Sequence, residues 1–308
     1  MCTLFDENAI ADVFCHHGEA RSLALAVEDL RNDLRAISGR TACIKRYLPR
    51  DEDGYVVVGS LTNPGFAAWV AGRGVDTAAI AGRWEHYLIS TFGDRRQNLL
   101  ICGSDARGAI FGVYEVCQRC LGVDPLSVWT DNEPQRRERL VIAPLHVVDG
   151  PKTFRYRGIF INDEDLLTEW RSGGGRRYTT YPFYHQVVHQ DIISKIAETA
   201  LRLKMNLIIP ASLIDIENPA EENLVRLVTE RGLLVSQHHV EPLGVSHFTW
   251  DNYWAARGKQ IPPSFVTQRE AFREIWTHYV RRWAQYPGVL WQLGLRGRGD
   301  RPVWWNDP

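Results

Sequence analysis

The sequence predicts an α/β fold in which a small N-terminal α/β domain, residues 1–150, precedes a truncated (β/α)8 TIM barrel, residues 151–308. The first observation is that strand-like apolar runs alternate with amphipathic helical patterns along the chain, which is typical of layered α/β proteins. The second is the turn signal Asp149-Gly-Pro151, after which the units become longer. The third is that polar clusters directly follow several strands of the second half, as in barrel enzymes.

The N-terminal half shows both kinds of periodicity. Apolar residues recur at helical spacing within residues 20–38 and again within residues 109–121, and a glycine follows each pattern as a stop signal. Apolar runs predict strands at 55–58, 86–92, 98–102 and 140–142. The link after the third strand lacks the glycine spacing of a phosphate-binding loop. We therefore interpret it as a turn with Ser104 or Asp105 as the helix N-cap.

After residue 151 the pattern consists of four strand-then-helix units. The predicted strands are 158–161, 205–210, 233–237 and 289–293, and the predicted helices are 189–204, 219–231 and 268–285. Because helix-length segments separate the strands, we expect them to lie parallel in one sheet, as at the start of a barrel. The glycine-rich segment 171–177 predicts a flexible, basic loop.

Charge and hydropathy exclude several classes of partner. The 36 basic and 37 acidic residues give a net charge of −1, which gives no support for a nucleic-acid or anionic-membrane partner. No apolar run approaches the ~20 residues that a membrane helix needs. The first residues are acidic where a signal peptide has a basic start, so either the protein is intracellular or its true start or signal is not in this chain.

All six cysteines lie in the first 120 residues. Cys117 and Cys120 form a C-x-x-C inside a helical pattern, and no second pair has the spacing of a zinc site. We therefore predict free, buried thiols that behave as small hydrophobic residues.

Three clusters of polar residues each follow a predicted strand of the second half. They are Asn162 to Asp165, His238 to Glu241 and Arg296 to Asp300. The C-terminal ends of barrel strands converge on one pocket, so we expect the clusters to form a shared site. The competing structural interpretation is that Asn162 and Asp163 cap a turn, as these residue types often do.

Two of the clusters have further alternatives. Asp300 can pair with a neighbouring surface arginine, and Arg296 can orient a carboxylate of the first cluster instead of a ligand. If His238 and His239 continue their strand, they point to opposite faces, and His239 and Glu241 then share one face. A zinc site there lacks a clear third ligand, so we favour hydrogen bonds from these residues to a ligand or within the core. The sequence thus predicts no metal and no cofactor.

The motifs taken together resemble glycoside hydrolase family 115. They are the N-D-E-D of the first strand end, the H-H-x-E-P of His238–Pro242 and the G-L-R-G-x-x-D of Gly294–Asp300, with the G-S-D-x-R-G-x-x-x-G-x-Y of Gly103–Tyr114 in the N-terminal domain. The resemblance covers residues from about 20 to 308. It implies an α-glucuronidase that removes (4-O-methyl)glucuronic acid from xylan or related polysaccharides and oligosaccharides. It also suggests a secreted or periplasmic location, and a homodimer is left open.

The implied chemistry assigns roles to the clustered residues. Removing a uronic acid needs a proton donor at the glycosidic oxygen and, in an inverting enzyme, a carboxylate that activates water. The guanidinium of Arg296 can hold the carboxylate of the sugar by a bidentate fork. The predicted catalytic residues are Asp163, Asp300 and Glu164, and the predicted substrate-binding residues are Asn162, Arg296, His238, His239 and Glu241.

The chain departs from the family pattern in two respects. Leu295 stands where the family usually has methionine, which is a mild change. The family also continues past this point with further barrel strands, whose Lys-Glu-Val and Asp-Asp-Asn segments carry site residues, and its general acid lies there. We therefore expect the 308-residue chain alone to have little or no activity. The alternative is a non-catalytic or vestigial carbohydrate-binding protein.

Overall fold

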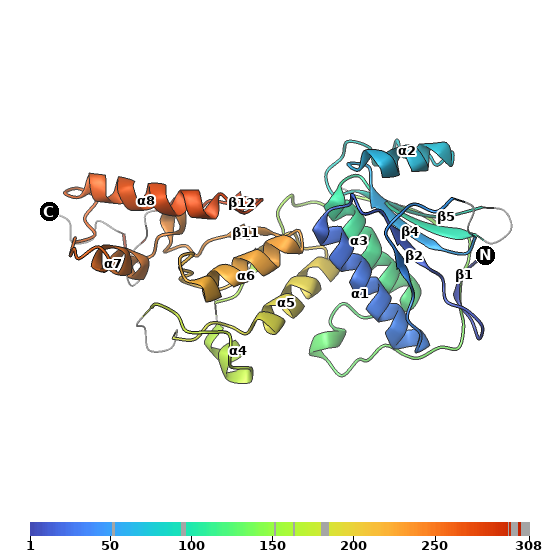
Figure 1. Ribbon diagram of the computed structural model, residues 1–308, viewed down its shortest axis with the longest axis horizontal. Coiled ribbons are helices and arrows are strands. Elements are labelled where there is room, and N and C mark those ends of the chain that lie inside the picture. The colour runs from blue at the N-terminus through green and yellow to red at the C-terminus, as the bar shows by residue number, and fades with distance from the viewer. Residues whose placement is uncertain are drawn as a thin grey trace. The chain divides into compact units, whose positions relative to one another are not determined.

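The computed structural model describes residues 1–50, 53–93, 97–150, 152–162, 164–179, 185–294, 296, 301 and 302. The chain divides into two compact units (Figure 1). Unit 1 comprises Met1–Arg155 with Leu201–Lys204, and unit 2 comprises Tyr156–Ala200 with Met205–Pro308. The α/β fold class is confirmed, whereas the division into domains at residue 150 stays a prediction. Among the described helices, none is long and apolar enough to cross a membrane.

Unit 1 alternates strands and helices along most of its length. Its elements are β1 (Cys2–Phe5), β2 (Val13–Cys15), α1 (Arg21–Ser38), β3 (Ile44–Lys45), β4 (Val56–Ser60), α2 (Pro64–Gly72), β5 (Tyr87–Phe92), β6 (Asn98–Gly103), α3 (Ala106–Val116), the π-helical turn η1 (Cys117–Leu121), the 3-10 turn η2 (Ser127–Trp129), β7 (Leu140–Ile142) and β8 (His146–Asp149). The predicted helix at 109–121 therefore begins earlier and ends in a π-helical turn, with Gly122 at φ +74° as its stop.

The main sheet of unit 1 has the strand order β3-β2-β4-β6-β5-β8. The first four strands in this order run parallel, whereas β5 runs antiparallel to both β6 and β8. β1 and β7 form a separate antiparallel pair. The two longest helices, α1 and α3, pack together against one face of the sheet, and α2 covers the other face (Figure 1).

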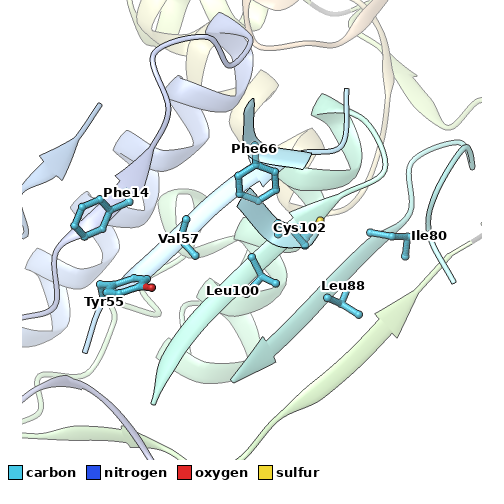
Figure 2. Packing of buried hydrophobic residues seen from close by; sticks show 9 residues of the cluster. Phe14, Tyr55, Val57, Phe66, Ile80, Leu88, Leu100 and Cys102 are labelled. Carbon is cyan, nitrogen blue, oxygen red and sulfur yellow. The ribbon is translucent and has the colours of Figure 1, made fainter. Parts of the chain in front are cut away.

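Alternating side chains of the strands build an apolar layer on each face. Val57 and Leu100 face α2, where Phe66 packs onto them (Figure 2). On the opposite face Gly112 of α3 lies so close to β6 that an added Cβ would stand 2.8 Å from the Cγ2 atom of Ile101. The absence of a side chain at residue 112 therefore sets how closely α3 approaches the sheet.

The loop between β6 and α3 is a capped turn, as the sequence predicts. Asp105 is the N-cap of α3, and its Oδ1 accepts a hydrogen bond of 2.7 Å from the Gly108 N–H. Its Oδ2 accepts a second bond of 3.0 Å from the N–H of Glu85. One carboxylate thus ties the start of α3 to the loop that leads into β5.

Asp105→Ala is expected to lower the free energy of unfolding by about 1–2 kcal/mol, because the change leaves two backbone N–H groups without their acceptor. Urea unfolding measures this loss. The matched control is Asp76→Ala, since Asp76 is also an aspartate that accepts one backbone bond, from Ala78, but on an exposed turn. The control is expected to change stability by less than about 0.5 kcal/mol, and an equal loss in both variants would contradict the capping argument.

All six cysteines are free, as predicted. Burial raises the pKa of the Cys15 and Cys102 thiols to about 12. The prediction that all are buried is wrong for Cys43, which is exposed, and Cys120 is only partly buried. Cys43 lies in the short connection before β3, outside the apolar layers of the sheet.

Unit 2 consists of longer strand-then-helix units. Its elements are β9 (Gly158–Phe160), α4 (Glu164–Trp170), α5 (Gln190–Arg202, whose last residues belong to unit 1), β10 (Leu207–Ile209), α6 (Pro219–Glu230), β11 (Leu234–Ser236), the 3-10 turn η3 (Pro242–Gly244), α7 (His247–Ala255), α8 (Arg269–Trp283) and β12 (Val289–Leu290).

The four predicted strands of the second half form one sheet. Its order is β12-β11-β10-β9, and each neighbouring pair runs parallel. Strands that follow one another in the sequence are therefore neighbours in space, with α4 and α5 between β9 and β10, α6 between β10 and β11, and α7 and α8 between β11 and β12. This arrangement confirms the prediction of parallel strands and brings their C-terminal ends to a common edge.

Candidate functional site

The predicted site residues that the structure describes come after strands of unit 2 along the chain. Asn162 lies after β9 with an exposed side chain, and Glu164 begins α4 with a buried one. Arg296 is exposed and forms an isolated backbone bridge with Pro302. Asp163 and Asp300 lie outside the described residues, so their predicted roles and separation stay predictions.

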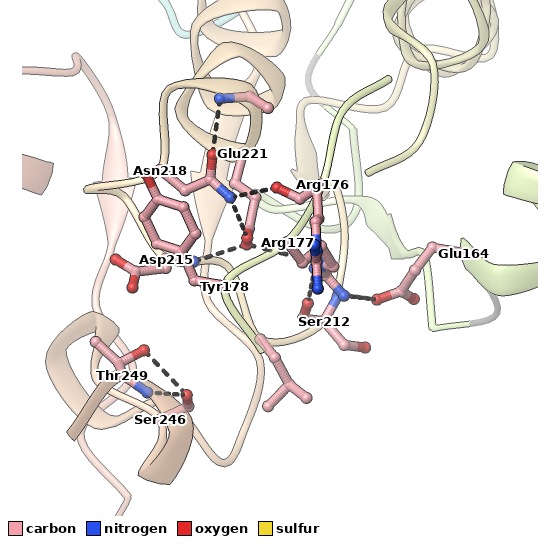
Figure 3. Close-up of polar contacts among 12 residues, drawn as sticks. Glu164, Arg176, Arg177, Tyr178, Ser212, Asp215, Asn218, Glu221, Ser246 and Thr249 are labelled. Atoms are coloured by element: carbon pink, nitrogen blue, oxygen red, sulfur yellow. Dashed lines mark hydrogen bonds and ion pairs between the residues drawn. The ribbon is translucent and has the colours of Figure 1, made fainter. Parts of the chain in front are cut away.

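The loop after β10 joins these strand ends through Ser212 (Figure 3). Its N–H donates to Oε1 of Glu164 at 2.8 Å, and its hydroxyl donates to Oδ1 of Asn162 at 3.0 Å. Its carbonyl accepts a hydrogen bond from Nη2 of Arg177. Every polar group of Ser212 is therefore engaged, and the loop after β10 is held to the end of β9.

Arg177 is the buried cation of this region. Its side chain is 1 % exposed, its Nη1 lies 3.3 Å from Oε1 of Glu164, and its Nε lies 3.7 Å from Oε2 of Glu221. Both carboxylates are equally buried. Burial raises the pKa of the Glu164 carboxyl, and the charge of Arg177 opposes that rise. Because the arginine and both carboxylates are buried, removing any one of them would leave an uncompensated charge in the interior.

The segment that carries Arg177 is not simply the flexible basic loop that the glycines predict. An added Cβ on Gly174 would stand 2.1 Å from the carbonyl oxygen of Val187, so the segment packs directly on neighbouring backbone. Gly175 has φ +120°, a conformation that residues with a side chain rarely adopt. The glycines thus allow a close approach that inserts Arg177 between the loops.

Glu221 lies in the first turn of α6 and is fully buried. Its Oε2 accepts from the N–H of Asp215 at 2.8 Å, and its Oε1 accepts from Nδ2 of Asn218 at 2.9 Å. Asn218 is the N-cap of α6. Burial raises the pKa of Glu221 to about 7, and the charge of Arg177 opposes this rise.

Glu241 links the loop after β10 to the end of β11. Its Oε2 accepts from the N–H of His238 at 2.9 Å and from the N–H of Leu213 at 3.2 Å. Burial raises the pKa of this carboxyl to about 8. Leu213 has φ +56°, a strained conformation for a leucine, and the bond to Glu241 is one of the contacts that hold it. Glu241 therefore fixes backbone rather than facing solvent.

The two histidines do not continue their strand, so the condition under which they would point to opposite faces is not met. β11 ends at Ser236, and the chain turns so that the N–H of Glu241 donates to the carbonyl of His238 at 2.9 Å. The rings of His238 and His239 lie 4.0 Å apart between centroids, and the ring of His238 also lies 5.0 Å from that of Phe160. The strand period of two does not apply once the strand has ended.

Sequence reasoning missed the buried residues that connect the loops. Arg177, Ser212, Asp215 and Glu221 have no spacing that marks them, because their partners lie in other loops. The one available signal is the number of acidic residues after the strands. If such carboxylates are buried, they need a cation nearby, because an unpaired buried charge is costly. Within the described parts of the chain, no group of three or more histidine, cysteine or acidic residues could hold a metal ion.

A groove of about 740 Å³ lies between α7 and α8, and its lining includes none of the predicted site residues. Tyr253 contributes to the lining, but the guanidinium of Arg257 already stands 3.4 Å from the centroid of its ring. That ring face is therefore occupied by a side chain and does not offer a platform for a sugar.

Comparison with solved structures shows a similar fold in a family GH115 4-O-methyl-alpha-glucuronidase with specificity for decorated arabinogalactans. The TM-score is 0.78 and the identity 24 %, over 98 % of this chain and 37 % of that protein. The chain thus spans well under half the length of that relative. A Flavobacterium johnsoniae chitobiase matches with a TM-score of 0.44 and 14 % identity, over 77 % of this chain and 32 % of the chitobiase. No curated protein matches the sequence.

The family comparison is more specific than the structural one. A model of glycosyl hydrolase family 115 matches residues 149–307, which is more than half of the chain and includes all the predicted strand-end clusters. The resemblance seen in the motifs is therefore confirmed. This chain belongs to glycosyl hydrolase family 115.

Proposed function

We propose that the protein carrying this chain is a glycosidase that releases (4-O-methyl)glucuronic acid from decorated glycans such as xylan. The observation that carries the proposal is the family match over residues 149–307, the segment that holds every predicted catalytic and substrate-binding residue. The similar solved structure is a 4-O-methyl-alpha-glucuronidase, which supports the same reaction class.

We further propose that β9 to β12 are the first half of a (β/α)8 barrel. The support is their sequential order, their parallel direction and the helices between them. In such a barrel the exposed Asn162 and Arg296 stand at the end of the fold where substrates bind.

The roles within the site follow from charge and burial. Asp163 and Asp300 are proposed to act on the water side, where an inverting enzyme separates its two carboxyl groups by roughly 6.5–9.5 Å. Arg296 is proposed to bind the sugar carboxylate, and His238 and His239 its hydroxyl groups. The buried Glu164 and Glu241 are proposed to hold loops in place, because each accepts backbone hydrogen bonds beneath the surface.

The test is release of glucuronic acid by the full natural polypeptide that contains this sequence, assayed on decorated xylo-oligosaccharides and on a decorated arabinogalactan. Asp300→Asn is expected to lower kcat by about 10²–10⁴-fold, because the variant cannot accept a proton from water. Asp76→Asn is the matched control, since Asp76 is exposed and lies in unit 1. The 308-residue chain assayed alone is expected to show little or no release.

Absence of release from both glycans by the full polypeptide would overturn the proposed activity. Release with an unimpaired Asp300→Asn variant would leave the activity standing and remove Asp300 from the mechanism.

A further inference from the structure

The loops after β9 and β10 are joined by one planar group. The guanidinium of Arg177 directs Nη1 to Glu164, Nη2 to the carbonyl of Ser212 and Nε toward Glu221. These three partners follow β9, follow β10 and begin α6, so a single side chain reaches three separate segments of unit 2. The rigid fork of arginine suits this arrangement, whereas the ammonium of lysine is a point charge on a flexible stem.

The end of this connection is an exposed side chain. Arg177 and Glu164 hold the carbonyl and the N–H of Ser212, and the Ser212 hydroxyl donates to Oδ1 of Asn162. With its oxygen engaged in this way, the amide of Asn162 is oriented so that its NH₂ group is the end available to donate. Asn162 is exposed at the end of β9, whereas the residues that hold it are buried.

We propose that Arg177 is a positioning residue that acts through Ser212 to orient the Asn162 amide toward oxygen atoms of the bound glucuronic acid. The ligand class rests on the proposed function, but the connection from Arg177 to Asn162 does not. The interaction is indirect, so Arg177 touches no substrate atom. A displacement of about 1 Å at a binding group can lower a rate 10²-fold, so the orientation of the amide matters for turnover.

The closing experiment uses the full natural polypeptide and compares Arg177→Lys with Arg176→Lys. Arg176 is the adjacent arginine, and its side chain is exposed, so the same substitution there is the matched control. Arg177→Lys is expected to lower kcat/KM on decorated xylo-oligosaccharides about 10- to 100-fold, while Arg176→Lys leaves it unchanged. Lysine retains the buried positive charge, so the variant is expected to fold.

A double-mutant cycle separates positioning from a general loss of structure. In an Asn162→Ala background, Arg177→Lys is expected to have little further effect on kcat/KM, because the group that it orients is gone. Ser212→Ala, which removes only the connecting hydroxyl, is expected to mimic Arg177→Lys. An undiminished effect of Arg177→Lys in the Asn162→Ala background would overturn the proposal.

Hydrogen exchange gives a second readout that does not depend on activity. Arg177→Lys is expected to accelerate exchange at the N–H of Ser212 about tenfold or more, because the carbonyl of Ser212 and the Glu164 carboxylate that accepts from this N–H both lose the guanidinium that fixes them. Unchanged exchange in the peptide that spans residues 210–214 would overturn the proposal even if the enzyme had no activity on glucuronides. Lack of activity in the unmodified protein would instead overturn the proposed function alone.

Discussion

Replacing Glu221 by alanine is expected to lower the free energy of unfolding of unit 2 by about 3–5 kcal/mol, the usual loss when one partner of a buried ion pair is removed. Glu221 is fully buried and faces the buried Nε of Arg177. Its removal also takes away the oxygen that accepts from the N–H of Asp215 and one of the two oxygens that accept from Nδ2 of Asn218, the other being the carbonyl of Arg176. Each lost acceptor for a buried donor costs about 1–3 kcal/mol in its own right.

Urea unfolding followed by tryptophan fluorescence measures this loss, because Trp170 and the seven tryptophans after it belong to unit 2. The matched control is Glu230→Ala on the same helix. Glu230 pairs with Arg226 one turn away at 2.8 Å, and both side chains are partly exposed, at 39 % and 49 % respectively. Such a pair contributes only about 0.3–0.5 kcal/mol. Similar losses for the two variants would contradict the view that Glu221 closes a buried network.

Stability is expected to fall as the pH rises toward 8, because Glu241 keeps a proton in the folded protein. Burial raises the pKa of Glu241 to about 8, whereas an unfolded glutamate titrates near about 4.3. Between these values the folded state binds the proton and the unfolded state has released it. Each pH unit in that window therefore removes about 1.4 kcal/mol from the free energy of unfolding. The contribution is complete below about pH 4.3 and is lost as the pH rises through about 8.

The raised pKa of Glu241 reflects its whole surroundings. Burial is the largest cause, the charge of Glu221 adds to it, and the charge of Arg177 with the N–H groups of His238 and Leu213 opposes it. Glu221 itself, with a pKa raised to about 7, contributes a slope of the same sign. The two contributions can be separated by substituting one carboxyl at a time.

Glu241→Gln keeps an oxygen that can accept from His238 and Leu213 but removes the titration. Its unfolding free energy, measured between pH 5 and 8, is expected to be less dependent on pH than that of the unmodified chain by about one proton. Glu230→Gln, on the exposed face of α6, serves as the control and is expected to retain the original slope. A Glu241→Gln variant with an unchanged slope would show that Glu241 is already ionised in the folded state.

Much of the fold could be predicted because its signals are local. The strands at 158–161, 205–210, 233–237 and 289–293 are short apolar runs bounded by polar residues, and all four lie in the expected sheet. Helix α1 has apolar residues at helical spacing and a glycine stop, so its C-terminal end is predictable, whereas Ala20 at its start provides no side-chain cap. β1 and β8 lack such a pattern, because each depends on a partner far along the chain, β7 and β5 respectively.

The candidate site could be predicted only in part, for a related reason. The polar residues after the strands can be identified from the sequence because they interrupt apolar runs, and this pattern marks Asn162 and Glu241 as candidates. Their orientations depend on tertiary contacts, so the sequence does not decide whether Glu241 contacts a ligand or is satisfied within the core. In the structure Glu241 accepts from the backbone of Leu213 and His238. Arg177 carries no local signal, because its three partners come from three different segments.

Of the six cysteines, all of them in the described part of the chain, only Cys43 is exposed. A maleimide dye at neutral pH is therefore expected to react fastest at Cys43, since Cys120 is partly buried and the remaining thiols are buried. Burial also raises the pKa of the Cys15, Cys102 and Cys117 thiols. Cys43 lies in unit 1, whereas most of the tryptophans lie in unit 2. A dye on Cys43 therefore reports on unit 1, and tryptophan fluorescence reports mainly on unit 2. The denaturation of the two units can be followed in a single sample without any substitution.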